Sequence, residues 1–221
     1  RRRRRSRRRR APRRLGREAE FRPEALAEAS RLVESYSAAS ASTYRDRTDL
    51  EMYTIDNEDT EDMDDALSFR ALPDGQFEIG IHITDAASVI EIPSPLFDVA
   101  LTRATSIYCP DRQVPMLPHN LSEGVLSLRP QEIRRAMSFF VIVNEQGDIL
   151  SRTIEPTIVK SSSKLSYREV DHVLFDDGDE LLDDAGHRVG VAEVARRESG
   201  VDQVQRQRDR LTLRQRRLQL G

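Results

Sequence analysis

The sequence predicts an α+β fold, in which a mixed or antiparallel sheet carries flanking helices. Apolar and polar residues alternate over residues 77–83, which is the two-residue period of a half-buried strand. Turn-forming residues at 73–75 and 144–148 separate pairs of strand-like runs and indicate two hairpins. Because helix-like and strand-like segments do not alternate regularly, the βαβ repeats of a parallel sheet are not expected.

The N-terminal half supplies a helix, a short strand and the first hairpin. Residues 23–36 place their apolar side chains on one side of a helix, and a linker of small residues follows over 37–43. Residues 53–55 form a short strand that leads directly into an acidic loop. Residues 66–71 and 77–83 then form the first antiparallel hairpin.

The next segments supply a second helix, a loop and the second hairpin. Ser94 is expected to cap a helix that has proline at its first position and ends at about residue 105. Residues 109–118 hold three prolines, which predict an ordered loop with little regular structure. Residues 137–143 and 149–159 form the second hairpin.

The C-terminal part is expected to be mainly helical. Ser166 and Glu169 have the spacing of a capping box, which begins a helix. A flexible acidic loop follows over residues 175–184. The chain then closes in a helical region where apolar residues recur every seven positions from Val204.

The charge of the chain is unevenly distributed. Of 221 residues 38% are hydrophobic and 33% are charged, and the formal net charge is −3. Residues 1–14 contain 11 arginines and no acidic residue, which leaves 24 basic and 38 acidic residues elsewhere. We expect residues 1–20 to be a disordered, solvated tail; an RNA-binding arm, a misassigned reading frame and a transit peptide are the alternatives. Residues 21–221 are expected to form the domain.

Hydropathy and cysteine content limit the class of protein. No run approaches the roughly 20 apolar residues of a membrane span, and no leader pattern indicates secretion. The single cysteine, Cys109, excludes an internal disulfide and favours a reducing compartment. We therefore expect no membrane contact and a location in the cytoplasm, or in an organelle if the source is eukaryotic. We also expect a monomer.

The residues that indicate chemistry lie in the acidic segment 55–67. Four of its aspartates fall within ten positions: Asp56, Asp62, Asp64 and Asp65. Like charges about 4 Å apart repel by ~1 kcal/mol even in bulk water, so such a cluster needs solvation or cations to stay ionised. Carboxylate oxygens suit Mg²⁺ or Mn²⁺. Two such ions ~4 Å apart can activate water and stabilise the leaving oxygen of a phosphodiester.

The same acidic segment has two alternatives to a catalytic metal site. An EF-hand counted from Asp56 is excluded, because Glu61 and Leu67 stand where glycine and glutamate are required. A solvated acidic loop is, on the residues alone, as well supported as a metal site.

Seven segments carry a wider pattern. They are YTIDNEDTEDMDDAL at 53–67, GIHITDA at 80–86, SPLFD at 94–98, TSIYCPD at 105–111, VPMLP at 114–118, LSEGVLSLRP at 121–130 and KLSYREV at 164–170. In order and spacing they resemble the ribonuclease II / ribonuclease R family, specifically the N-terminal portion of its RNB catalytic domain. The resemblance covers about residue 21 to the C-terminus.

This resemblance implies a processive 3′→5′ exoribonuclease that hydrolyses single-stranded RNA to nucleoside 5′-monophosphates with Mg²⁺, or Mn²⁺ in its place. The four aspartates match signature positions and are implied to be both catalytic and metal-binding. The counterparts of Asp56 and Asp65 ligate Mg²⁺ most directly, and that of Asp62 supports the metal. The counterpart of Asp64 is the one most needed for cleavage.

The resemblance also implies a role for one aromatic residue. Tyr108 matches a family tyrosine that stacks on the RNA near its 3′ end, and an aromatic face can hold any base. A core position is the alternative for Tyr108. His82 alternates with apolar strand residues and is expected to be structural, and Cys109 is expected to be unreactive.

The chain departs from the family pattern in extent. Family members carry OB domains on either side of the catalytic domain. The second half of that domain, with an arginine that grips the scissile phosphate, has no counterpart here. We therefore expect an exposed apolar patch or poor folding. The alternative for this chain is a truncated, catalytically inactive RNA-binding fragment, and an unrelated Mg²⁺-dependent phosphatase or nuclease would explain only the aspartates.

Overall fold

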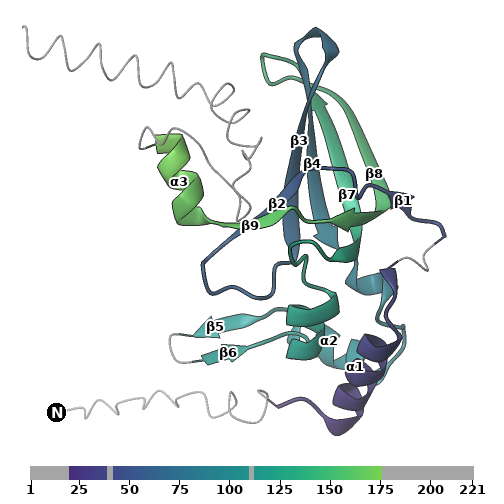
Figure 1. The fold of residues 1–221 in the computed structure, drawn as a ribbon. Coiled ribbons are helices and arrows are strands. Elements are labelled where there is room, and N and C mark those ends of the chain that lie inside the picture. The colour runs from purple at the N-terminus through teal and green to yellow at the C-terminus, as the bar shows by residue number, and fades with distance from the viewer. Residues whose placement is uncertain (1–19, 39–41, 110–111, 176–221) are drawn as a thin grey trace, which may run out of the picture.

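The structure, a computed structural model, describes residues 20–38, 42–109 and 112–175. Its largest element is a seven-stranded mixed sheet with the strand order β1-β8-β7-β4-β3-β2-β9. Figure 1 shows this sheet in one half of the molecule, with helices α1 and α2 and the β5–β6 hairpin in the other half. The predicted α+β class is therefore confirmed.

The sheet is built mainly from antiparallel neighbours. Its strands are β1 (Arg45–Asp46), β2 (Met52–Asp56), β3 (Asp65–Leu72), β4 (Gln76–Thr84), β7 (Ile133–Val143), β8 (Ile149–Lys160) and β9 (Ser163–Ser166). The β3–β4 and β7–β8 pairs confirm the two predicted hairpins. The two edge strands β1 and β9 pair in parallel with β8 and β2. Neither edge strand was predicted, because both are too short to show a period of their own.

The helices confirm the predicted caps. In α2 (Pro95–Arg103) the Ser94 hydroxyl accepts a hydrogen bond from the Phe97 amide at 3.0 Å. In α3 (Tyr167–Phe175) Ser166 and Glu169 form the reciprocal bonds of a capping box. Helix α1 (Pro23–Ser35) packs against α2 and the turn Asn120–Val125. Their common core contains Ala25, Ala29, Val89, Ile90, Leu96, Leu121 and Leu126.

One predicted loop proved to be a hairpin. The prediction of little regular structure over 109–118 is wrong at its start, because β5 (Ile107–Cys109) pairs with β6 (Arg112–Val114). The three prolines explain the difference. They stand at positions 110, 115 and 118, outside both paired strands, so they remove no hydrogen bond from the ladder.

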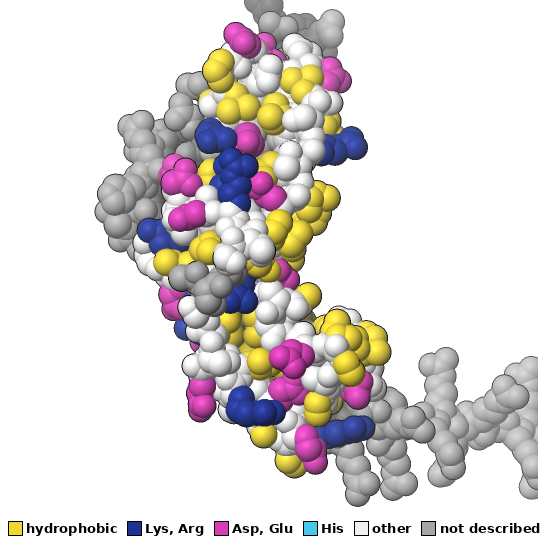
Figure 2. All heavy atoms as spheres, turned by 90° about the vertical axis from the view of Figure 1, so that its right-hand side faces the viewer, with side chains coloured by type: hydrophobic (Ala, Val, Ile, Leu, Met, Phe, Trp, Pro, Cys, Tyr) yellow, Lys and Arg dark blue, Asp and Glu magenta, His cyan; other side chains and the backbone are white. Residues whose placement is uncertain are grey.

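The two faces of the sheet differ. On one face His82 is fully buried and lies between the hydroxyls of Ser68, at 2.9 Å, and Ser138, at 2.7 Å. This confirms the expected structural role of His82. On the other face Ile81, Phe139 and Ile154 are adjacent in register across three strands and remain 36–62% exposed. The expected apolar patch is therefore present, and Figure 2 shows hydrophobic side chains gathered along one edge of the sheet half.

Several predictions fall outside the described residues. These are the arginine-rich tail over 1–19, part of the linker at 39–41, most of the acidic loop over 175–184, and the closing helical region. Among the described helices, none is long and apolar enough to span a membrane.

Candidate active site

The acidic loop connects the end of β2 at Asp56 to the start of β3 at Asp65. Figure 1 shows it at the lower end of the sheet, between α3 and the β5–β6 hairpin. Strand β2 stops where the apolar residues stop, since the next positions are almost all carboxylates or small polar residues. The sheet thus fixes the two ends of the loop, and other contacts must fix its middle.

Backbone contacts hold the middle of the loop from two sides. On one side Lys164 of β9 donates from Nζ to the carbonyls of Glu58, at 2.9 Å, and Thr60, at 2.6 Å. On the other side the Ser127 hydroxyl donates to the carbonyl of Glu61 at 2.7 Å. The Leu128 amide also donates to the carbonyl of residue 63 at 2.7 Å. The loop therefore has a defined path although it forms no regular structure.

A cleft of about 570 Å³ opens beside this loop. It brings together four predicted site residues: Asp56, Asp62, Asp64 and Tyr108. Asp65 does not line the cleft, although its charge acts on Asp56. Gln113, Glu123 and Tyr167 also line it, and sequence reasoning gave none of them a role.

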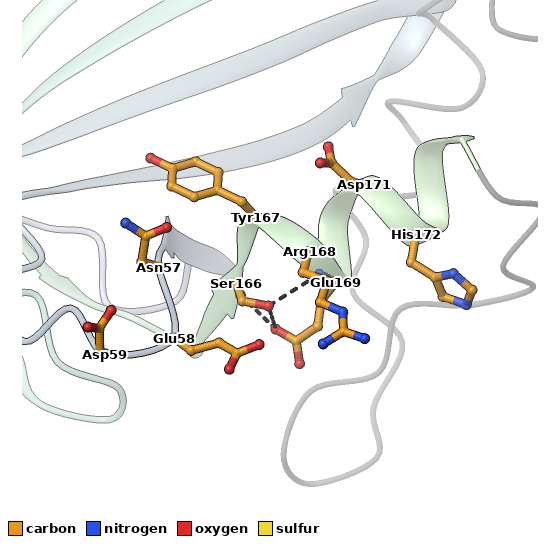
Figure 3. A pocket seen from close by; sticks show the side chains of 9 residues that line it. All are labelled: Asn57, Glu58, Asp59, Ser166, Tyr167, Arg168, Glu169, Asp171 and His172. Atoms are coloured by element: carbon orange, nitrogen blue, oxygen red, sulfur yellow. Dashed lines mark hydrogen bonds between the residues drawn. The ribbon is translucent and has the colours of Figure 1, made fainter.

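A second cleft of about 1000 Å³ lies between the acidic loop and α3 (Figure 3). Asn57, Asp59 and Tyr167 line both clefts, so the two adjoin. Figure 3 shows the Tyr167 ring leaving the start of α3 on the side of the loop residue Asn57. The Tyr167 side chain is 55% exposed, so the combined groove offers an aromatic face to solvent.

The β5–β6 hairpin contacts the acidic loop through Asp62. The Tyr108 hydroxyl donates to Oδ2 of Asp62 at 2.7 Å, and the Gln113 amide donates to the same oxygen at 3.2 Å. Tyr108 is 67% exposed, so the alternative that it is a core residue is wrong. Partial burial, and then the hydrogen bond to Asp62, raise the pKa of Tyr108 to about 12. Tyr108 therefore stays protonated and remains a donor at neutral pH.

Burial and neighbouring negative charges disfavour the ionised form of two carboxyl groups in the loop. Burial is the largest cause that raises the pKa of Asp56 to about 6, and the charge of Asp65 is the next. Asp64 and Asp62 act in the same direction, whereas Lys164 opposes them. Desolvation also raises the pKa of Asp64, with smaller contributions from Asp65 and Asp62. The site thus concentrates more negative charge than its own cations neutralise.

This donor set suits a hard divalent cation. Among the described residues, no three histidine, cysteine, aspartate or glutamate side chains converge as a complete metal cage. Mg²⁺ does not need one, because it typically takes one or two carboxylates and fills its remaining positions with water and substrate phosphate. Oxygen-only donors with raised pKa values, beside an open cleft, match that mode of binding.

Comparison with known proteins defines the class. The sequence matches the RNB domain family over residues 44–220, so the chain belongs to that family. It is 36% identical over 155 residues to ribonuclease R 2 of Lactococcus lactis subsp. lactis, covering 70% of this chain and 23% of that protein. The protein named inactive exonuclease DIS3L2 of Arabidopsis thaliana is also 36% identical over 157 residues, covering 71% of this chain and 15% of that protein.

The fold agrees with the sequence comparison. The apo structure of Mycoplasma genitalium RNase R matches with a TM-score of 0.71 and 29% identity, over 86% of this chain and 29% of that one. The same enzyme has been solved with ribose-methylated single-stranded RNA and with double-stranded RNA. The chain spans less than a quarter of the length of the curated relatives named above.

Proposed function

We propose that this chain is the metal-binding portion of a 3′→5′ exoribonuclease, which hydrolyses single-stranded RNA with Mg²⁺, or Mn²⁺ in its place. The observation that carries the proposal is the single cleft that unites Asp56, Asp62, Asp64 and Tyr108 in a member of the RNB family. Ribonuclease names among the relatives, and RNA in the complexes of M. genitalium RNase R, support the substrate class.

The residues divide into metal-holding and RNA-holding groups. Asp56, Asp62, Asp64 and Asp65 would hold the metal; Asp65 does not line the cleft, but its charge acts on Asp56. When bound, Mg²⁺ would activate the attacking water and stabilise the leaving oxygen of the phosphodiester. Tyr108 would stack on a base without regard to its identity, which suits an enzyme that shortens any sequence.

The hydrogen bonds of Asp62 suggest how these two groups cooperate. Tyr108 and Gln113 both donate to Oδ2 of Asp62, so the hairpin that carries the stacking ring also orients a carboxylate of the metal site. A base stacked on Tyr108 would therefore lie beside the carboxylates. A phosphodiester next to the stacked nucleotide could then supply oxygens to the same cation.

A second candidate is a non-catalytic RNA-binding fragment. Its support is the short extent of the chain relative to its relatives, together with the relative named as an inactive exonuclease. The acidic cleft would then bind a cation and RNA without cleavage.

The test is a time course on a 5′-labelled single-stranded RNA, with Mg²⁺ or with EDTA. We expect a descending ladder that needs Mg²⁺ and that slows by about 10³-fold in Asp64→Asn, which removes one metal-site charge without changing shape. The matched control is Asp74→Asn in the β3–β4 turn, where the positive φ of 61° also suits asparagine. Its rate should equal that of the wild type. Retarded but intact RNA in every lane would support the second candidate instead.

A further inference from the structure

Lys164 is placed by the same strand pair that places Asp56. In the parallel β2–β9 pairing, Thr54 is opposite Lys164 and Asp56 is opposite Ser166. The ammonium group of Lys164 reaches across the loop and donates to the carbonyls of Glu58 and Thr60. One side chain thus ties residues 58 and 60 of the acidic loop to the edge of the sheet.

These contacts hold together a loop whose side chains repel one another. Seven of the ten residues from Asp56 to Asp65 carry carboxylates, and like charges at close range push the chain apart. Ser127 and Leu128 hold the later part of the loop, at residues 61 and 63. Among the described contacts, Lys164 provides the matching hold on the earlier part, next to Asp56.

We propose that Lys164 is a positioning residue, which fixes the backbone of the acidic loop so that its aspartates are arranged for a divalent cation before the cation binds. The inference rests on the proposed function, because it takes the loop to be the metal site. Lys164 makes no hydrogen bond to a carboxylate of the cleft in the described structure; it acts through the loop backbone.

Positioning and charge predict opposite effects for Lys164. An ammonium group close to the site repels a dication, so removing its charge alone would strengthen cation binding. Removing its two backbone contacts would release the loop, and the aspartates would have to be ordered when the cation binds. The sign of the change therefore separates the two roles.

The experiment measures Mn²⁺ binding to the full 221-residue chain by electron paramagnetic resonance, without RNA. Lys164→Met keeps an unbranched side chain that is one atom shorter, and removes all the side-chain donors. We expect Mn²⁺ to bind about tenfold more weakly, as is typical when a group that supports a metal site is removed. Lys164→Arg keeps the charge and can donate to two carbonyls, so its affinity should return to within about threefold of the wild type.

Controls separate this effect from loss of fold. Lys160→Met changes the only other lysine of the chain, at the end of β8, and should leave the Mn²⁺ affinity unchanged. Thermal unfolding midpoints of all variants, in EDTA, show whether they fold. If Lys164→Met does not fold, Lys164→Ala replaces it; alanine also has no side-chain donor, so the same weakening is expected.

The outcomes distinguish the inference from the proposed function. Tighter or unchanged Mn²⁺ binding by a folded Lys164→Met or Lys164→Ala variant overturns the positioning role and leaves the metal site intact. A wild-type chain that binds no Mn²⁺ overturns both this inference and the metal part of the proposed function.

Discussion

Two regions of this molecule withdraw polar side chains from water: the middle of the sheet and the loop between β2 and β3. In the sheet, the ring nitrogens of His82 meet the hydroxyls of Ser68 and Ser138, and Ser138 in turn meets Thr157. These groups are neutral and have partners. Burial, and then the charge of Arg47, lower the pKa of His82 to about 4, so the ring stays uncharged at neutral pH.

The polar groups of the β2–β3 loop, in contrast, are charged and lack full neutralising partners among the described residues. The loop gathers carboxylates, and partial burial, followed by their mutual repulsion, raises the pKa of Asp56 to about 6. Its backbone is satisfied by Lys164 and Ser127, but its negative charges are not neutralised to the same degree. A buried polar group that serves stability is paired within the fold. The unbalanced charge of the loop supports the proposal that a cation from solution completes this group.

The largest effect that the comparison predicts is on the sheet. His82→Ala leaves the hydroxyls of Ser68 and Ser138 without their imidazole partner and opens a cavity in the sheet interior. We expect it to reduce the free energy of unfolding by about 3 kcal/mol. Urea unfolding at pH 7.5 measures this.

The matched control for His82→Ala is His119→Ala. His119 is on the surface, where its side chain is 53% exposed and contacts Glu123. Its replacement should change the free energy of unfolding by no more than about 0.5 kcal/mol. A loss from His82→Ala as small as that expected for His119→Ala would show that the hydrogen bonds of His82 with Ser68 and Ser138 add nothing to the stability of the sheet.

The second prediction concerns the wall of the cleft. Tyr108→Ala removes the aromatic face and should weaken binding of single-stranded RNA by about tenfold, equivalent to ~1.4 kcal/mol. Tyr108→Phe keeps the face but loses the hydrogen bond to Asp62, and should bind within about twofold of the wild type. Fluorescence anisotropy of labelled RNA, with EDTA to prevent cleavage, measures both. If phenylalanine is as damaging as alanine, the hydroxyl contact matters and stacking does not.

The regular part of the fold could be predicted because its signals are local. The alternation over residues 77–83 and the turns beside it belong to one stretch of chain, and β4 lies between β3 and β7 as a hairpin sheet requires. Strand β9 has only four residues, and its partner β2 lies about 110 positions away. No local period could reveal that pairing.

The candidate site divides in the same way. The aspartates stand out by their spacing, and Tyr108 by the family resemblance, so both could be predicted. Lys164 acts on residues more than 100 positions away, and Ser127 and Gln113 act over more than 50. These residues became visible only when the fold brought distant segments together, because an isolated lysine, serine or glutamine carries no pattern.

The smallest predicted effect is on the loop, and it has the opposite sign to that of His82→Ala. Without metal, ionisation of Asp56 disfavours the folded chain, because folding raises the pKa of this carboxyl group from 3.8 to about 6. Its contribution therefore falls as the pH rises from about 4 to 6. His82, with its pKa lowered from 6.5, contributes stability that grows over nearly the same range.

Asp56→Asn removes the ionisable group, and with it the loss of stability that its ionisation causes, but keeps the size of the side chain. In EDTA at pH 7 we expect it to increase the free energy of unfolding by about 1 kcal/mol, a figure reduced for the partial exposure of Asp56 to solvent. The rise of stability between pH 4 and 6.5 should become steeper, since one contribution that opposes His82 is removed. Urea unfolding across this pH range measures both changes.

Metal should reverse the order of the two proteins. Under the proposed function Mg²⁺ would bind only the folded site, so it should stabilise the wild type by mass action and Asp56→Asn much less. Asp56→Asn would then unfold with a higher free energy than the wild type in EDTA, and with a lower one in Mg²⁺. If Asp56→Asn is destabilising in EDTA as well, the charge of Asp56 is already balanced by groups within the fold. The polar groups of the loop are then paired internally, as those of the sheet are.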